Sequence, residues 1–89
     1  MTPAKGQFNT INETTNLGIG FLVAESEAGD YQPVSAVSTI SEAREMVAHD
    51  LRLRMQMLKE GSDPICPARY LVWARGNAGD YQVAATITA

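Results

Sequence analysis

The segment between Thr39 and Gly61 restricts the fold more than any other part of the sequence. Thr39-Ile40-Ser41-Glu42 matches the capping box, in which the threonine oxygen accepts a hydrogen bond from the N3 amide and the glutamate accepts one from the threonine N–H. The apolar residues that follow lie on an arc of about 200° at helical spacing. They are Ile40, Ala43, Met46, Val47, Leu51, Leu53, Met55, Met57 and Leu58. The sequence predicts one helix from about Ile40 to Glu60, with an apolar side wide enough to cover a sheet.

Two extended segments precede the predicted helix. In the first, from about Leu17 to Ser26, large apolar residues alternate with smaller ones, which is the two-residue period of a strand. Its strongly apolar face consists of Leu17, Ile19, Phe21 and Val23. The second segment runs from Tyr31 to Ser38, and turn-forming residues at 27–30 join the two into a hairpin.

Two more strands follow the helix. Pro64 and Pro67 enforce an extended connector, and residues 70–74 are apolar on both faces, as in a central strand. A last strand begins at Tyr81, and its apolar face consists of Tyr81, Val83, Ala85 and Ile87.

The five residues Ala-Gly-Asp-Tyr-Gln occur at 28–32 and again at 78–82, which predicts the same turn in both hairpins. The order of elements is then β-β-α-β-β. We expect an α+β fold in which one long helix packs on one face of a four-stranded, mainly antiparallel sheet. Residues 17–89 form this single domain, and residues 1–16, rich in Thr, Asn, Gly and Pro, are expected to form a flexible N-terminal arm.

Composition argues against several classes of protein. The 89 residues carry a net charge of −3 without a basic run, so nucleic acid and membrane surfaces are not expected partners. No apolar run reaches the length of a membrane span and the first residues lack a signal-peptide pattern, which favours a cytoplasmic protein. One cysteine and one histidine make neither a disulfide nor a zinc site, and no cofactor is expected.

The sequence contains no recognisable catalytic constellation. His49 falls on the polar side of the predicted helix, and no partner that would make it a general base is evident. Cys66 lies in a loop between prolines, without a basic neighbour to activate its thiol. We therefore expect a protein that is not an enzyme, in which His49 is solvated and Cys66 is inert.

Asp50, Arg54 and Trp73 are three candidates for partner binding. Asp50 and Arg54 are four residues apart inside the apolar arc, so they are expected to pair. Their pair either stabilises the helix at the margin of the core or lies in an interface, where arginine is enriched. Trp73 either packs within the sheet or is an exposed anchor for a partner.

Glu25, Glu27 and Asp30 are three more candidates, gathered at the first hairpin with no basic residue between them. Such a run is either simply solvated or an acidic surface for a basic protein, which would raise the association rate more than the affinity. A metal ion is not expected here, because hard cations need six or more oxygen ligands and no such loop is present.

Two stretches resemble the HicB-like antitoxin family. Gly29-Asp30-Tyr31 before Thr39-Ile40-Ser41-Glu42-Ala43 is similar to the family's glycine-rich hairpin turn and T-x-x-E-A helix start, and Leu58-Lys59-Glu60-Gly61 before Pro64-Ile65-Cys66-Pro67 is similar to its helix exit. The resemblance runs from about Leu17 to the end. It implies a partial ribonuclease-H-like fold that neutralises a small basic toxin, often with an added DNA-binding segment.

The chain also departs from that family. No helix–turn–helix or ribbon–helix–helix segment follows Ile87, and the carboxylates of an active ribonuclease H are absent. We therefore expect a non-enzymatic, HicB-like protein-binding module without a DNA-binding segment, in contact with a small basic protein. The alternative is a small-ligand-binding or self-assembling domain with a pocket lined by Tyr70, Trp73 and Met57. A homodimer is expected in either case, because one helix leaves one sheet face uncovered.

Overall fold

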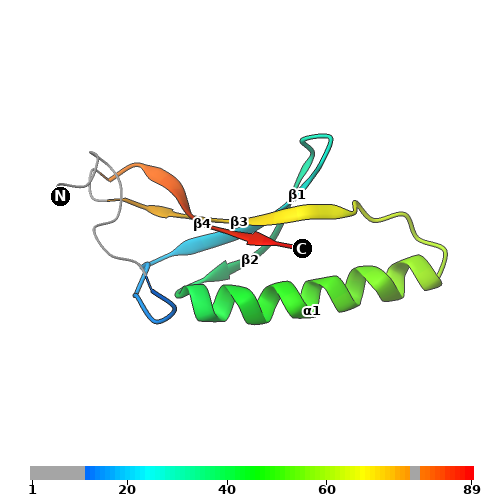
Figure 1. The fold of residues 1–89 in the computed structure, drawn as a ribbon, viewed down its shortest axis with the longest axis horizontal. Coiled ribbons are helices and arrows are strands. Elements are labelled where there is room, and N and C mark those ends of the chain that lie inside the picture. Colours follow the sequence, from blue (N-terminus) through cyan, green and yellow to red (C-terminus); the bar gives the residue numbers. More distant parts are fainter. Residues whose placement is uncertain (1–11, 77–78) are drawn as a thin grey trace.

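A computed structural model of the chain describes residues 12–76 and 79–89. Within these residues the elements are β1 (Gly20–Ser26), β2 (Tyr31–Val37), α1 (Ile40–Lys59), β3 (Pro67–Arg75) and β4 (Tyr81–Thr88). The strands form one antiparallel sheet in the order β2-β1-β3-β4, and α1 runs along one face of it (Figure 1). The predicted ββαββ order and α+β fold are confirmed.

Helix α1 begins and ends where its capping residues predict. Thr39 is the N-cap, with an extended backbone, and its side-chain oxygen accepts a hydrogen bond from the N–H of Glu42 at 3.1 Å. The Glu42 carboxylate accepts its bond from Ser38 N–H at 3.1 Å, one residue before the donor that the capping box predicts. At the other end Gly61 has a φ of 86°, which allows the chain to leave the helix.

The two hairpins share one turn geometry, as the repeated sequence predicts. Gly29 and Gly79 have φ values of 89° and 90°, a region that favours glycine. The N–H of Ser26 donates to Asp30 O at 2.9 Å in the first turn, and the N–H of Gly76 donates to Asp80 O at 2.9 Å in the second. Residues 77–78 of the second turn lie outside the described residues.

The core lies between the sheet and the first half of α1. Leu22, Val72 and Tyr70 are the largest side chains that are completely buried, and Ile40 and Val47 of α1 pack against them. Burial of this kind contributes about 1.5–3 kcal/mol for each large apolar side chain. This layer fixes α1 on the sheet.

The face of β1 that packs against the core is not the face that the sequence predicted. Leu22 and Ala24 are buried under α1, whereas Phe21 is 43% exposed on the other face and Ile19, which precedes the strand, is 68% exposed. Both sets of residues are apolar enough to be buried, so alternation alone did not determine which face α1 covers. The predicted strand start at Leu17 was also wrong, because the chain enters the sheet only at Gly20.

Strand β4 changes faces at a β-bulge, which the predicted single apolar face did not include. Trp73 pairs with Val83 and Val72 pairs with Ala85, so Ala84 is the extra residue. Tyr81 and Val83 therefore lie on the face away from α1. Beyond the bulge the odd-numbered residues point toward α1 instead, and Ile87 is buried in the core. Strand β2 has a similar irregularity opposite Leu22 and Val23.

The second half of α1 was predicted to pack against the sheet, but most of its apolar side chains are exposed. Four apolar residues of the predicted arc are 41–59% exposed here: Leu53, Met55, Met57 and Leu58. The helix is 20 residues long, or about 30 Å, whereas β1 and β2 have seven residues each and span about 23 Å. The part of the prediction that placed these residues against the sheet was wrong.

The segment from Asn12 to Asn16 lies beside the start of α1. The N–H of Ser41 donates to Glu13 O at 2.9 Å, and the Glu13 carboxylate pairs with Arg44 Nε at 2.8 Å. The flexibility expected for residues 1–16 stays a prediction, and residues 1–11 lie outside the described part of the chain.

Replacing the N-cap tests how much the start of α1 contributes to folding. Thr39→Ala removes the acceptor for the N–H of Glu42, so the free energy of unfolding should fall by about 1 kcal/mol in urea denaturation. Ser41→Ala, an exposed position two residues later, is the control and should change it by less than about 0.5 kcal/mol. Equal losses in the two variants would contradict the assignment of Thr39 as the cap.

Candidate binding surface

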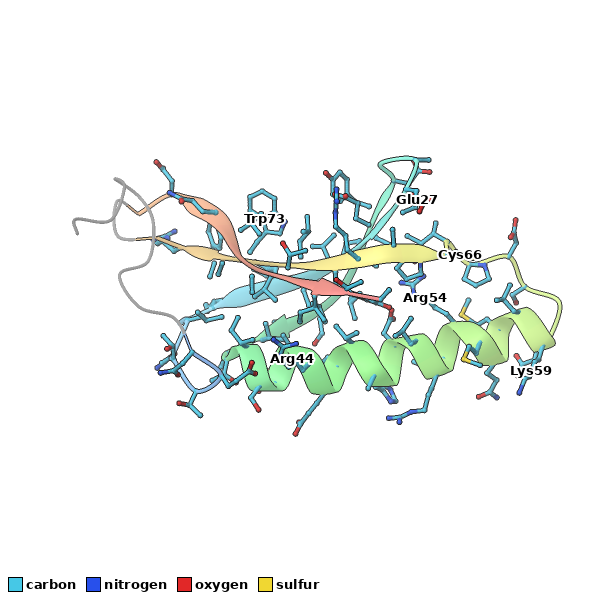
Figure 2. The ribbon with its side chains drawn as sticks, in the orientation of Figure 1. Glu27, Arg44, Arg54, Lys59, Cys66 and Trp73 are labelled. Carbon is cyan, nitrogen blue, oxygen red and sulfur yellow. The ribbon has the colours of Figure 1, made fainter. Side chains whose placement is uncertain are left out.

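The sheet face opposite α1 is largely aromatic and aliphatic, and we call it the uncovered face. Register places its members together, because Phe21 pairs with Trp73 and Trp73 with Val83, and paired residues point to the same side. The apolar and aromatic side chains of the uncovered face are Phe21, Val23, Tyr31, Leu71, Trp73, Tyr81 and Val83. Figure 2 shows Trp73 on the side of the sheet away from α1.

Contacts between side chains organise the uncovered face around β3. The rings of Phe21 and Tyr81 lie 5.8 Å apart at an angle of 44°, and the guanidinium carbon of Arg75 lies 5.4 Å from the centre of the Tyr81 ring. Leu71 is buried at 8% exposure and Trp73 is partly buried. The middle of the patch is therefore more buried than its border, where Phe21, Tyr31 and Tyr81 are exposed.

Glu25 lies on the uncovered face rather than at the hairpin tip with the other two acidic candidates. It is 4% exposed and forms an ion pair with Arg69 on β3. Hydrogen bonding to the Glu25 carboxylate, and then its charge, raise the pKa of the exposed Tyr31 phenol on β2. Glu27 and Asp30 are exposed in the hairpin, so only two of the three predicted carboxylates are accessible to a basic partner.

Asp50 and Arg54 pair as predicted, but on the buried side of α1. Arg54 Nε donates to Asp50 Oδ2 at 2.6 Å, and the hydroxyl of Tyr70 donates to the same oxygen at 2.5 Å. Arg54 Nη1 donates to Gln32 Oε1 at 2.6 Å and to Ile65 O at 3.3 Å. Figure 2 shows Arg54 between α1 and the sheet. The pair therefore joins α1 to β2, to β3 and to the connector before β3.

Tyr70 is the member of this cluster that the sequence did not identify. Its position in the apolar run 70–74 predicted a core residue, which is correct, but a buried tyrosine hydroxyl also needs a hydrogen-bond partner. Burial raises the pKa of Tyr70 far above its ordinary value of 10.0, and the hydrogen bond to Asp50 and its negative charge raise it further. The sequence did contain a signal for this cluster: Asp50 is a carboxylate inside the apolar arc of the helix, and Tyr70 is a tyrosine expected in the core.

The structure does not support the ligand pocket that the sequence suggested between Tyr70, Trp73 and Met57. Tyr70 is buried on the α1 side of the sheet, while Trp73 lies on the uncovered face. The hollow that does adjoin the apolar end of α1 measures about 290 Å³ and lies between α1 and the connector to β3. Its walls include Leu51, Met55, Leu58, Ile65 and Ala89.

Neither His49 nor Cys66 is part of a cluster that resembles a catalytic site. Both are exposed, His49 on α1 and Cys66 in the connector. In the described ranges, 12–76 and 79–89, no three His, Cys, Asp or Glu side chains gather closely enough to hold a metal ion. Helix α1, the only helix in those ranges, is not apolar enough to cross a membrane.

The fold and its uncovered face define a small α+β domain with one helix-covered and one exposed sheet face. No protein-family model, curated protein or solved structure matches the chain. The surfaces described above are therefore the basis for a proposal about function.

Removing the Tyr70 hydroxyl tests the polar cluster. Tyr70→Phe should lower the free energy of unfolding by about 1.5–3 kcal/mol, the range for a hydrogen bond to a charged group, whereas Tyr81→Phe on the exposed side should change it little. The folded state holds the Tyr70 proton more tightly than the unfolded chain, so this contribution is complete below pH 10.0 and declines as pH rises above it. The measurement is the free energy of unfolding between pH 8 and about 11. If it changes with pH equally in the wild type and in Tyr70→Phe, this role is contradicted.

Two arginines with equal exposure test the Glu25 pair. The side chains of Arg69 and Arg44 are each 55% exposed, but the partner of Arg69 is 5% exposed and the partner of Arg44 is 52% exposed. Arg69→Ala leaves a buried carboxylate without its ion-pair partner and should cost about 1–3 kcal/mol in thermal or urea unfolding. Arg44→Ala breaks a surface pair and should cost less than about 1 kcal/mol. Similar costs would mean that Glu25 is solvated.

Proposed function

We propose that this chain is a non-enzymatic protein-binding module that binds a second copy of itself through the uncovered face. The single observation that supports this is the set of aromatic side chains on the uncovered face, of which Phe21, Tyr31 and Tyr81 are 43%, 61% and 43% exposed. A sheet that is apolar on both faces gains stability when each face is buried against another layer. One layer is α1, and a second copy supplies the other.

The size of the uncovered face suits such a contact. Four strands spaced about 4.8 Å apart and about seven residues long give a projected area of roughly 450 Å². Side-chain relief enlarges the accessible area, so two copies packed face to face bury on the order of 1,200 Å² in total, at the lower limit for a stable complex. We therefore expect a dimer with a dissociation constant on the order of 1 µM rather than a permanent assembly.

The charges on the uncovered face are compatible with two copies meeting there. Glu25 is neutralised by Arg69, and Arg75 lies over the Tyr81 ring. A symmetric contact brings each patch against itself, so an unpaired carboxylate in the middle would repel its own copy. The exposed Glu27 and Asp30 lie in the hairpin turn at the border of the uncovered face and not among the strand residues that form it.

A second proposal for the same module is that it binds a small basic protein, as the HicB-like resemblance implies. Glu27 and Asp30 are exposed on a hairpin that, in Figure 1, rises on the side of the sheet away from α1. That position would allow contact with a small basic protein at the border of the uncovered face, as expected from the sequence. The burial of Glu25 weakens this reading, because it removes one of the three negative charges.

Introducing a charge on the uncovered face tests the proposal. Phe21→Glu should convert the dimer to a monomer across micromolar concentrations, measured by sedimentation velocity or light scattering after gel filtration, because the new carboxylates face each other across the symmetric contact. Val83→Glu, 42% exposed on β4, should act in the same way if Phe21→Glu alone disturbs folding.

The matched control is Leu53→Glu, which introduces the same charge at a residue that is 47% exposed on α1. This variant should stay dimeric, with an unchanged dissociation constant. A wild-type chain that is monomeric at about 100 µM, or a dimer that survives both face variants, would rule out the proposed contact.

A further inference from the structure

The two edges of the sheet differ in how well they are protected from another strand. Edge strands expose unpaired N–H and C=O groups, and proteins usually protect them with proline, charge or bulges. Both edge strands contain a bulge, but β2 also carries Pro33 and packs against α1. Strand β4, eight residues from Tyr81 to Thr88, contains neither a proline nor a charged residue, and no strand of the described residues lies beyond it.

A hollow adjoins the end of this edge. The N–H of Ala89, directly after β4, donates to Ala68 O at 3.3 Å, and Ala89 also lines the cavity of about 290 Å³ between α1 and the connector. The other walls are mainly apolar and include Leu51, Met55 and Leu58 of α1. A strand added beside β4 would therefore have main-chain partners along residues 85–88, beyond the bulge, and an apolar hollow close to one end.

We propose that the β4 edge and the adjoining hollow together form a binding site for an extended, uncharged segment of a partner protein. The segment adds a fifth strand beside β4 and places one large apolar side chain in the hollow. In this mode of recognition main-chain hydrogen bonds provide affinity, and a pocket for an alternate side chain provides specificity. The site is separate from the contact proposed for the uncovered face.

The bulge in β4 favours a partner segment over a second copy at this edge. Ala84 interrupts β4 near its middle, so an antiparallel pairing of β4 with its own copy would bring two bulges into one short ladder. Only residues 85–88 then form a regular run on each copy. A flexible segment has no fixed bulge of its own and can pair with those residues in full.

The hollow determines the kind of side chain that it accepts. Its volume of about 290 Å³ lies at the lower end of the range for small-molecule sites, which suits one side chain rather than a cofactor. Arg54 also lines it, but Arg54 already pairs with Asp50, so an acidic group would meet both charges of that pair. An aliphatic side chain such as leucine or methionine fits this wall.

The probe is a capped hexapeptide, Thr-Val-Thr-Leu-Thr-Val, titrated into the isotope-labelled full chain and followed by amide chemical shifts. We expect shifts at residues 85–88 and around the hollow, with a dissociation constant of about 1 mM or lower. The same peptide methylated on alternate backbone nitrogens, in either of the two possible patterns, should bind unequally, because only one set of N–H groups faces β4. Equal binding of the two methylated peptides, or no shift at 85–88, would overturn the proposal.

Two exposed leucines of α1 separate the hollow from the rest of the helix. Leu58 is 50% exposed and lines the hollow, while Leu53 is 47% exposed and does not. Leu58→Glu should weaken peptide binding about tenfold or more, and Leu53→Glu should leave it unchanged. Equal affinities would show that the hollow does not contribute and would contradict the site.

The same titration in Phe21→Glu separates this site from the proposed dimer. Phe21 lies on β1, and its ring contacts β4 at Tyr81, the end of that strand away from residues 85–88. The variant should therefore bind the peptide with unchanged affinity while it no longer dimerises. Loss of peptide binding only in the monomeric variant would show that the peptide depends on the dimer and would overturn an independent edge site.

Discussion

Neighbouring residues of β3 are buried on opposite sides of the sheet, and this constraint governs the rest of the molecule. Val72 is completely buried under α1, and Leu71 is buried on the uncovered face. A strand with two apolar faces belongs in the middle of a sheet and gains stability from a layer on each side. The chain itself supplies one layer, and the self-association that we propose would supply the other.

The Asp50, Arg54 and Tyr70 cluster fixes where α1 lies on the sheet. Apolar contacts between a helix and a sheet tolerate small displacements, whereas hydrogen bonds of 2.5 and 2.6 Å to one carboxylate oxygen specify a single arrangement. Breaking such a cluster at one member leaves a buried polar group without a partner, which costs more than the intact cluster contributes. We interpret Asp50 and Arg54 as residues that determine the fold rather than as members of an interface.

Features that depend on local chemistry could be predicted from the sequence, and features that depend on strand pairing could not. Thr39, Gly61 and the repeated turn gave the limits of α1 and of both hairpins, because caps and turns are set by neighbouring residues. The predicted core face of β1 was wrong because Leu22 and Phe21 are both apolar. The predicted single apolar face of β4 was wrong because the bulge at Ala84 cannot be recognised from the alternation of apolar and polar residues. For the same reason Glu25 looked solvated, since its partner Arg69 lies 44 positions along the chain.

The two halves of α1 differ in how strongly they are held to the rest of the molecule. Its first half is pinned by Ile40, Ala43 and Val47, whereas the turns after Arg54 lie against the connector and the solvent. Helical turns without core contacts are marginal in water and open locally without global unfolding. These turns form one wall of the hollow beside β4, so that wall has few core contacts and can adjust to side chains of different shape.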